Sequence, residues 1–167
     1  MAVKTVIRSG GGDIMKIWIL NGPNLNMLGI REPALYGRGD YASLEAYCRS
    51  ACEEISATVA GGIECEIFQS NHEGTLVDTI QRAYFEGVNG IVINPGAYTH
   101  TSIAILDALK AVSIPAAEVH LTDIRQREPF RQVSYAGMAC EAHYMGDGFE
   151  GYRKAVAYLA EKYGKRA

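Results

Sequence analysis

The stretch Gly90-Ile91-Val92-Ile93-Asn94 decides the fold. Its apolar residues follow one another. A strand with one solvent-exposed face would instead alternate apolar and polar residues. They therefore predict a central strand that is covered on both sides, as in parallel sheets. The run ends at once in the polar turn Asn94-Pro95-Gly96.

Outward from this strand, the chain alternates between strand patterns and helix patterns. Further strands are predicted at Lys16–Leu20, Ile63–Gln69 and Pro115–Leu121, with a weaker one between Met138 and Tyr144. Helices are predicted from Ser43 to about Val59, from about Glu73, from Thr101 or Ser102 to about Val112, and from Phe149 to Tyr163. The intervening helices have about the length that a right-handed parallel crossover needs. The sequence therefore predicts an α/β fold, a doubly wound sheet of five parallel strands with helices on both faces.

The length, composition and net charge of the chain are those of a soluble globular protein. The chain has 167 residues, of which 48% are hydrophobic and 21% charged, as expected of one globular domain. We expect a single catalytic domain over residues 15–167 and a disordered or loosely attached extension over residues 1–14. The formal charge of -3 argues against a nucleic-acid-binding surface. No run approaches the roughly 20 apolar residues that span a bilayer.

The four cysteines do not form a metal or redox motif. Cys48, Cys52, Cys65 and Cys140 lack paired CxxC spacing. We interpret Cys48 and Cys52, one helical turn apart, as small buried side chains rather than as shared metal ligands. A reducing, cytoplasmic setting fits these cysteines most simply.

The carboxyl ends of the predicted strands are where a ligand should bind, because open parallel sheets bind ligands at that edge. The turns there are polar, and they hold three of the four histidines, His72, His100 and His120. No HxH or HExxH spacing, GxGxxG loop or GxSxG elbow is present. The pattern favours a polar small-molecule site with general acid–base chemistry and without a metal.

Arg31 and Tyr36 suggest an activated base in the loop after the first strand. A tyrosine has an ordinary pKa near 10, so half ionisation at neutral pH requires a shift of roughly three units, about 4 kcal/mol. One or two guanidinium groups within about 5 Å can supply that amount when they are partly desolvated. Arg31, five residues before Tyr36 in a loop punctuated by glycine and proline, is placed to do so.

Five blocks together resemble type II 3-dehydroquinate dehydratase. They are Asn21-Gly22-Pro23-Asn24-Leu25, Arg31-Glu32-Pro33 with Tyr36-Gly37, Gln69-Ser70-Asn71-His72-Glu73-Gly74, Asn94-Pro95-Gly96 with Thr99-His100-Thr101-Ser102, and Glu118-Val119-His120. The resemblance covers nearly the whole chain from about Met15. It implies a flavodoxin-like fold and the dehydration of 3-dehydroquinate to 3-dehydroshikimate through an enolate, in the shikimate route to aromatic amino acids. It implies no cofactor and no metal.

The resemblance also implies roles for the reacting groups. Tyr36 would remove the proton beside the ketone, and Arg31 would hold the phenolate. His120 would protonate the departing hydroxyl, with Glu118 orienting it. Asn24 would position a water against the enolate oxygen.

Further residues are implied to hold the substrate. Asn94, His100 and Arg131 would bind its hydroxyl groups, the backbone amides of Leu121 and Thr122 its carboxylate, and Arg127 would close over the site. Asp107 would reach the site of a neighbouring subunit, in a trimer-based homo-oligomer that is commonly a dodecamer. Thr122 and Asp123 depart from the serine and asparagine usual in the family, and Asp123 is expected to weaken substrate binding modestly.

Three alternatives stay open at this point. The same reaction could serve quinate degradation, which sequence does not distinguish from biosynthesis. A non-catalytic or flavin-binding module on this fold would need a Ser/Thr-rich phosphate loop after the first strand, where Asn21–Gly29 offers asparagines and a proline. Imine chemistry would need a lysine near the strand ends, whereas Lys110 lies on a predicted helix.

Overall fold

The computed structural model describes residues 3–6, 13–30 and 39–166, with the backbone alone for residues 3–6. Its sheet has six strands in the order β1-β3-β2-β4-β5-β6. The strands are β1 (Val3–Val6), β2 (Met15–Asn21), β3 (Ile63–Gln69), β4 (Gly90–Asn94), β5 (Ala116–His120) and β6 (Ala142–Met145). The main helices of the described residues are α2 (Tyr41–Ser56), α3 (Glu73–Phe85), α4 (Ile103–Val112) and α5 (Glu150–Tyr163). Strands β2 to β6 pair in parallel, so the predicted doubly wound, flavodoxin-like fold is confirmed.

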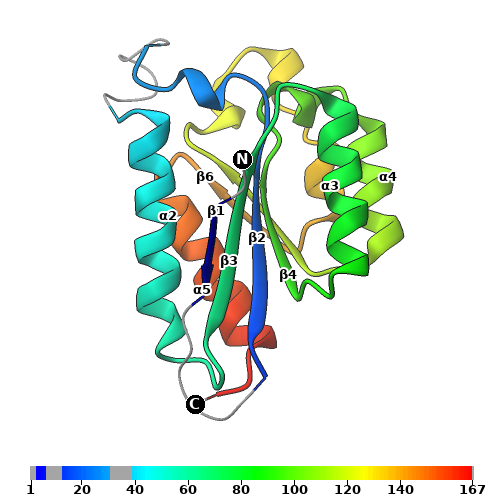
Figure 1. Cartoon of the computed structure of the whole chain (residues 1–167). Coiled ribbons are helices and arrows are strands. Elements are labelled where there is room, and N and C mark those ends of the chain that lie inside the picture. The colour runs from blue at the N-terminus through cyan, green and yellow to red at the C-terminus, as the bar shows by residue number, and fades with distance from the viewer. Residues whose placement is uncertain (1–2, 7–12, 31–38, 167) are drawn as a thin grey trace.

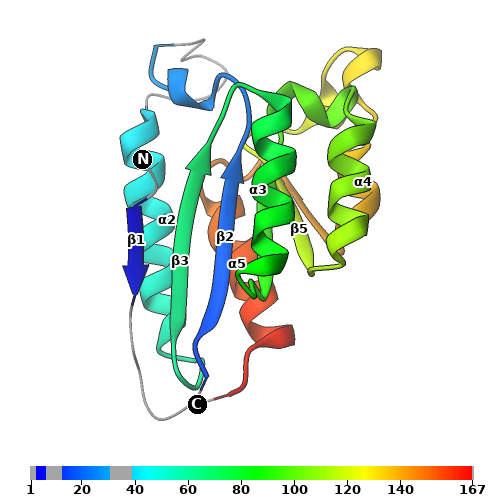
Figure 2. The ribbon, with the colours of Figure 1, turned by 45° about the vertical axis from the view of Figure 1, so that its right-hand side comes forward.

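Strand β1 was not predicted. It pairs antiparallel with β3, with Val3 opposite Ile67 and Val6 opposite Glu64, and Figure 2 shows its arrow running against that of β3. Within the extension that was expected to be disordered or loosely attached, Val3–Val6 are thus a strand of the sheet. Val3–Val6 form hydrogen bonds with the otherwise unpaired backbone edge of β3. The sequence pattern of residues 3–6 does not contain this information, because the partner strand lies far along the chain.

Helices cover the sheet on both faces (Figure 1). Strand β2 shows how one strand serves two cores, because successive side chains point to opposite faces. Ile17 and Ile19 pack in the apolar cluster with residues of α2 and α5. Trp18 and Leu20 pack in the cluster with residues of α3 and α4. This double burial explains the apolar runs of β2 and β4.

Two helix starts show how local polar groups set the boundaries. Ser102 caps α4, its Oγ accepting a hydrogen bond from the Ile105 amide at 2.9 Å, as one of the two predicted capping residues. Helix α2 begins earlier than predicted. Its cap is Asp40, whose Oδ1 accepts from the Ser43 amide at 2.7 Å, so Ser43 lies inside the first turn.

The strands β2, β3, β4 and β5 end at one edge of the sheet. Asn21 at the end of β2 lies opposite both Gln69 and Asn94. Within the described residues, no helix is long and apolar enough to cross a membrane. All four cysteines are free, and Cys48, Cys52 and Cys65 are buried, as interpreted from the sequence.

Candidate active site

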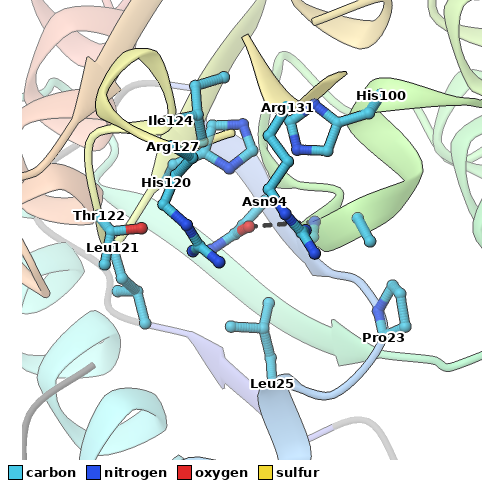
Figure 3. Close-up of a pocket in the computed structure, with 12 residues that line it drawn as sticks. Pro23, Leu25, Asn94, His100, His120, Leu121, Thr122, Ile124, Arg127 and Arg131 are labelled. Carbon is cyan, nitrogen blue, oxygen red and sulfur yellow. Dashed lines mark hydrogen bonds between the residues drawn. The ribbon is translucent and has the colours of Figure 1, made fainter. Parts of the chain in front are cut away.

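A pocket opens at the carboxyl edge of the sheet (Figure 3). It has a volume of about 70 Å³. Seven of the predicted site residues line it, namely Asn94, His100, His120, Leu121, Thr122, Arg127 and Arg131. Pro23 and Leu25, from the turn after β2, lie across it from His120 and Ile124.

The ends of β2 and β4 are tied together beneath this pocket by a tyrosine from α5. The fully buried Tyr152 donates its phenolic hydrogen to Asn21 Oδ1 at 2.7 Å and accepts from Asn94 Nδ2 at 2.9 Å. The Gly96 amide donates to Asn94 Oδ1 at 3.2 Å. Because both ends of its amide are held, Asn94 has a fixed orientation at the pocket wall.

Glu118 and His120 form a buried pair at the end of β5. They are two residues apart on one strand, so both side chains point to the same face. His120 Nε2 lies 2.8 Å from Glu118 Oε1. Among the described residues nothing bonds to His120 Nδ1, while His120 lines the pocket. The pair can therefore present one imidazole nitrogen to a ligand while the carboxylate holds the other.

Two hydroxyl groups complete the surroundings of the carboxylate. Thr99 and Ser134 each lie 2.6 Å from Glu118 Oε1, and the Gly137 amide donates to Ser134 Oγ at 2.8 Å. Burial by itself would raise the pKa of Glu118, but the hydrogen bonds from His120, Ser134 and Thr99 and the charge of His120 outweigh burial and lower it to about 2. Glu118 is therefore a carboxylate at neutral pH.

His100 is held in one tautomer. Its Nδ1 lies 2.8 Å from the carbonyl oxygen of Val133, and a carbonyl only accepts, so Nδ1 carries the hydrogen. Burial lowers the pKa of His100, the bond to Val133 opposes this, and the nearby His120 and Arg131 add to the lowering. His100 is then neutral at pH 7 and presents Nε2 as a hydrogen-bond acceptor to the pocket that it lines.

Two arginines make the pocket suited to an anion. Arg127 and Arg131 both line it, and Glu128 Oε2 lies 3.5 Å from Arg127 Nε and 3.0 Å from Arg131 Nε. One carboxylate thus positions two guanidinium groups from outside the pocket. Guanidinium groups bind carboxylates and hydroxyl groups well because their donors are arranged in a planar fork.

The remaining predicted residues are placed differently. Asn24 is exposed and has a left-handed backbone, with φ of 66°, between the two pocket residues Pro23 and Leu25. Asp107 is exposed on α4 and does not line the pocket. Arg31 and Tyr36 lie outside the described residues.

Several residues around the site were missed by the sequence reasoning. Thr99 and Ser134 were given no role, and His143 and Tyr152 were not singled out at all. The strand-end rule finds residues that follow a strand, whereas Tyr152 comes from a helix face and Ser134 from a loop. Tyr152 gave no separate signal, because a tyrosine on the apolar side of a helix usually belongs to the core.

Comparison with known proteins identifies the family of this chain. The family model for dehydroquinase class II matches residues 15–160. A 3-dehydroquinate dehydratase of Rhodopseudomonas palustris is 51% identical over 149 residues, covering 89% of this chain and 94% of that protein. A type II dehydroquinase structure from Butyrivibrio crossotus is 48% identical with a TM-score of 0.83, covering 89% of this chain and 99% of that chain. The chain therefore belongs to the class II dehydroquinase family.

Proposed function

We propose that the pocket between the ends of β2, β4 and β5 is where this chain dehydrates 3-dehydroquinate to 3-dehydroshikimate. The activity is that of a hydro-lyase, in agreement with the family to which the chain belongs. The observation that carries the proposal is the buried Glu118–His120 pair at the pocket, with His120 Nε2 at 2.8 Å from the carboxylate. Loss of a hydroxyl group needs a proton donor, and this pair supplies one.

The reaction divides into two proton transfers. A base removes the proton beside the ketone, which gives an enolate, and the hydroxyl group then leaves as water after it accepts a proton. His120 gives that second proton, and the Glu118 carboxylate, 2.8 Å from His120 Nε2, orients its imidazole. Tyr36 is the base, Arg31 holds its phenolate, and Asn24 positions a water that donates to the enolate oxygen.

The pocket residues hold the substrate in place. The neutral His100 accepts a hydrogen bond from a substrate hydroxyl group, and Asn94 and Arg131 contact the others. The substrate carboxylate binds the backbone amides of Leu121 and Thr122, with Arg127 over it. The two guanidinium groups at this pocket favour an anionic ligand over a neutral one.

The setting and assembly are part of the same proposal. The reaction serves the shikimate route, with quinate degradation as the alternative role of the same chemistry. The protein works in the cytoplasm as a trimer-based homo-oligomer, commonly a dodecamer, in which Asp107 reaches a neighbouring site. The exposed position of Asp107 on α4 supports a contact outside its own pocket.

The test is to add 3-dehydroquinate to the purified chain and to record the absorbance of the conjugated enone product. We expect product with the unmodified chain and none with Tyr36→Phe at unchanged fold and oligomer. Tyr84→Phe is the matched control, because Tyr84 is 61% exposed on α3 and should leave turnover unchanged. No product at saturating substrate would favour a non-catalytic binding module.

A second arm tests the enolate route against imine chemistry. Borohydride reduces an imine between a lysine and the substrate to a permanent bond, so it inactivates enzymes that form one. We expect full activity after treatment with borohydride and substrate. Irreversible loss of activity would contradict the enolate mechanism.

A further inference from the structure

A second histidine contacts the carboxylate of Glu118 from the side away from the pocket. His143 lies on β6 directly opposite Glu118 on β5. Its Nδ1 is 3.1 Å from Glu118 Oε2, the oxygen that does not contact His120. The His143 side chain is 44% exposed, whereas those of Glu118 and His120 are 0% and 6% exposed. One buried carboxylate therefore joins an imidazole at the pocket to an imidazole at the surface.

The position of the hydrogen on His143 follows from its partner. An ionised carboxylate only accepts hydrogen bonds, so His143 Nδ1 must carry a hydrogen in either charge state. A further proton can then be gained only at Nε2. Since no described residue bonds to Nε2 and the ring is nearly half exposed, this proton can come from solvent without breaking the contact with Glu118.

A glycine makes room for this contact. A Cβ at Gly137 would lie 2.4 Å from Glu118 Oε2 and 3.1 Å from His143 Cε1. Both distances are shorter than ordinary van der Waals contact, so a larger residue would displace the carboxylate or the imidazole. The approach of His143 to Glu118 thus depends on the absence of a side chain at position 137.

We propose that His143 is a positioning residue for the dehydration, which holds the second oxygen of Glu118 and thereby sets how strong an acid His120 is. This inference rests on the proposed role of His120 as the proton donor. The Nδ1 hydrogen of His143 draws charge from the carboxylate, so that the His120 imidazolium is less stabilised and gives up its proton more readily. A proton gained at His143 Nε2 strengthens this effect.

Glu118 is the main charged group that acts on His143, because the other ionisable groups described nearby are paired or neutral. His143 and Glu118 line a surface hollow of about 330 Å³, in which the other charged residue among those described is Arg125. Arg125 is paired with Asp123, with its Nε 2.8 Å from Asp123 Oδ1. Burial and the charge of Glu118 raise the pKa of the nearby Cys140, so that thiol carries no charge.

Two substitutions separate the hydrogen bond from the charge. His143→Asn keeps a donor near the position of Nδ1 but cannot gain a proton, and His143→Leu removes both. In His143→Leu the carboxylate is more basic, so the His120 imidazolium is better stabilised. The descending limb of kcat at high pH should then move to higher pH, and kcat should fall roughly tenfold with KM little changed. His143→Asn should keep most of kcat.

The direct measurement is an NMR titration of the histidine imidazoles in the full chain. In the unmodified protein the His120 signals should show two inflections, one from His120 and one from His143, because the two groups share one carboxylate. In His143→Asn the second inflection should be absent. His72, whose imidazole makes no hydrogen bond to Glu118, is the reference within the same spectra and should titrate alike in both proteins.

Each outcome decides the proposal. Identical His120 titrations and identical pH profiles in all three proteins would overturn it. If His143→Leu does not fold, the comparison with His143→Asn decides alone: a lost second inflection supports the proposal, and a retained one overturns it. The titration needs no turnover, so absent dehydratase activity would count against the proposed function and not against the coupling of the histidines.

Discussion

Glu118 Oε1 lies 2.8 Å from His120 Nε2, and three further donors reach the same carboxylate from Thr99, Ser134 and His143. A fully buried carboxylate with this many donors is stabilised in its charged form. It is therefore a stabilising element of the fold and, in the proposed mechanism, the group that orients His120.

The first prediction concerns the stability of the fold in acid. The pKa of Glu118 is about 2 in the folded chain and about 4.3 in an unfolded one. A lowered folded pKa contributes stability above the unfolded value, and this contribution is lost as the pH falls from about 4.3 to about 2. The loss amounts to about 3 kcal/mol. Urea unfolding at pH 7 and pH 3 should show a little more than half of this loss, about 2 kcal/mol, and Glu118→Gln should remove that part of the difference.

The control for this experiment is Glu53→Gln, because Glu53 is an exposed residue of α2. It should keep the pH dependence of the unmodified chain. A Glu118→Gln chain with the same acid sensitivity would show that this carboxylate is not the group responsible. At neutral pH the variant should also lose about 100-fold in kcat.

The second prediction concerns the tyrosine beneath the pocket. Tyr152→Phe leaves Asn21 Oδ1 and Asn94 Nδ2 without their buried partner, so the free energy of unfolding should fall by about 2 kcal/mol. KM should rise because Asn94 is then held only at its oxygen, by the Gly96 amide. Denaturant unfolding and steady-state kinetics measure both effects. Tyr163→Phe is the control, since its hydroxyl is bonded to Glu141 at the exposed surface, and it should change stability by less than about 0.5 kcal/mol.

The third prediction concerns His100. At pH 7 its imidazole should be neutral with the hydrogen on Nδ1, because Nδ1 donates to the Val133 carbonyl. Its lowered pKa means that it gains a second proton only below the ordinary value of about 6.5. Substrate binding should weaken as the pH falls through that lowered pKa, because Nε2 changes from acceptor to donor. Long-range nitrogen–proton NMR identifies the tautomer, and a hydrogen found on Nε2 alone would contradict the assignment.

The fourth prediction concerns the turn after β2. A Cβ at Gly22 would lie 2.3 Å from the carbonyl oxygen of Pro95, and the Gly22 amide donates to Asn94 O at 2.7 Å. Gly22→Ala must therefore separate the ends of β2 and β4, and we expect a loss of at least about 3 kcal/mol of stability. Gly74→Ala is the control, because nothing lies within 4 Å of its Cβ position. That change in α3 should be neutral or slightly stabilising, and thermal melts distinguish the two.

Much of the fold could be predicted from the sequence, because strands that are buried on both faces of a sheet appear as uninterrupted apolar runs. Ile63–Gln69 and Gly90–Asn94 were predicted with the bounds that the structure has. The start of α2 was misplaced because Asp40 and Ser43 are both good capping residues, and the choice depends on the path of the preceding loop. The strand β1 was missed because pairing with β3 is decided by a distant segment.

Some residues of the site could likewise be predicted from the sequence, and others could not. His100, His120 and Asn94 follow parallel strands or end them, so the strand-end rule brings them to one pocket. The rule did not identify His143, because this residue lies within β6 and not at its end. It contacts Glu118 as its neighbour on the adjacent strand β5. Asp107 carried a role only through the family resemblance, and it lies exposed on α4, away from the pocket.

The bridge from Tyr152 to Asn21 and Asn94 also bears on how the protein is made. The strands that carry the two asparagines emerge from the ribosome well before α5, which spans Glu150–Tyr163. In a nascent chain without this helix, the amides at the strand ends have no tyrosine to orient them. An ordered pocket therefore requires α5, and catalytic competence should appear only after this helix has emerged and packed.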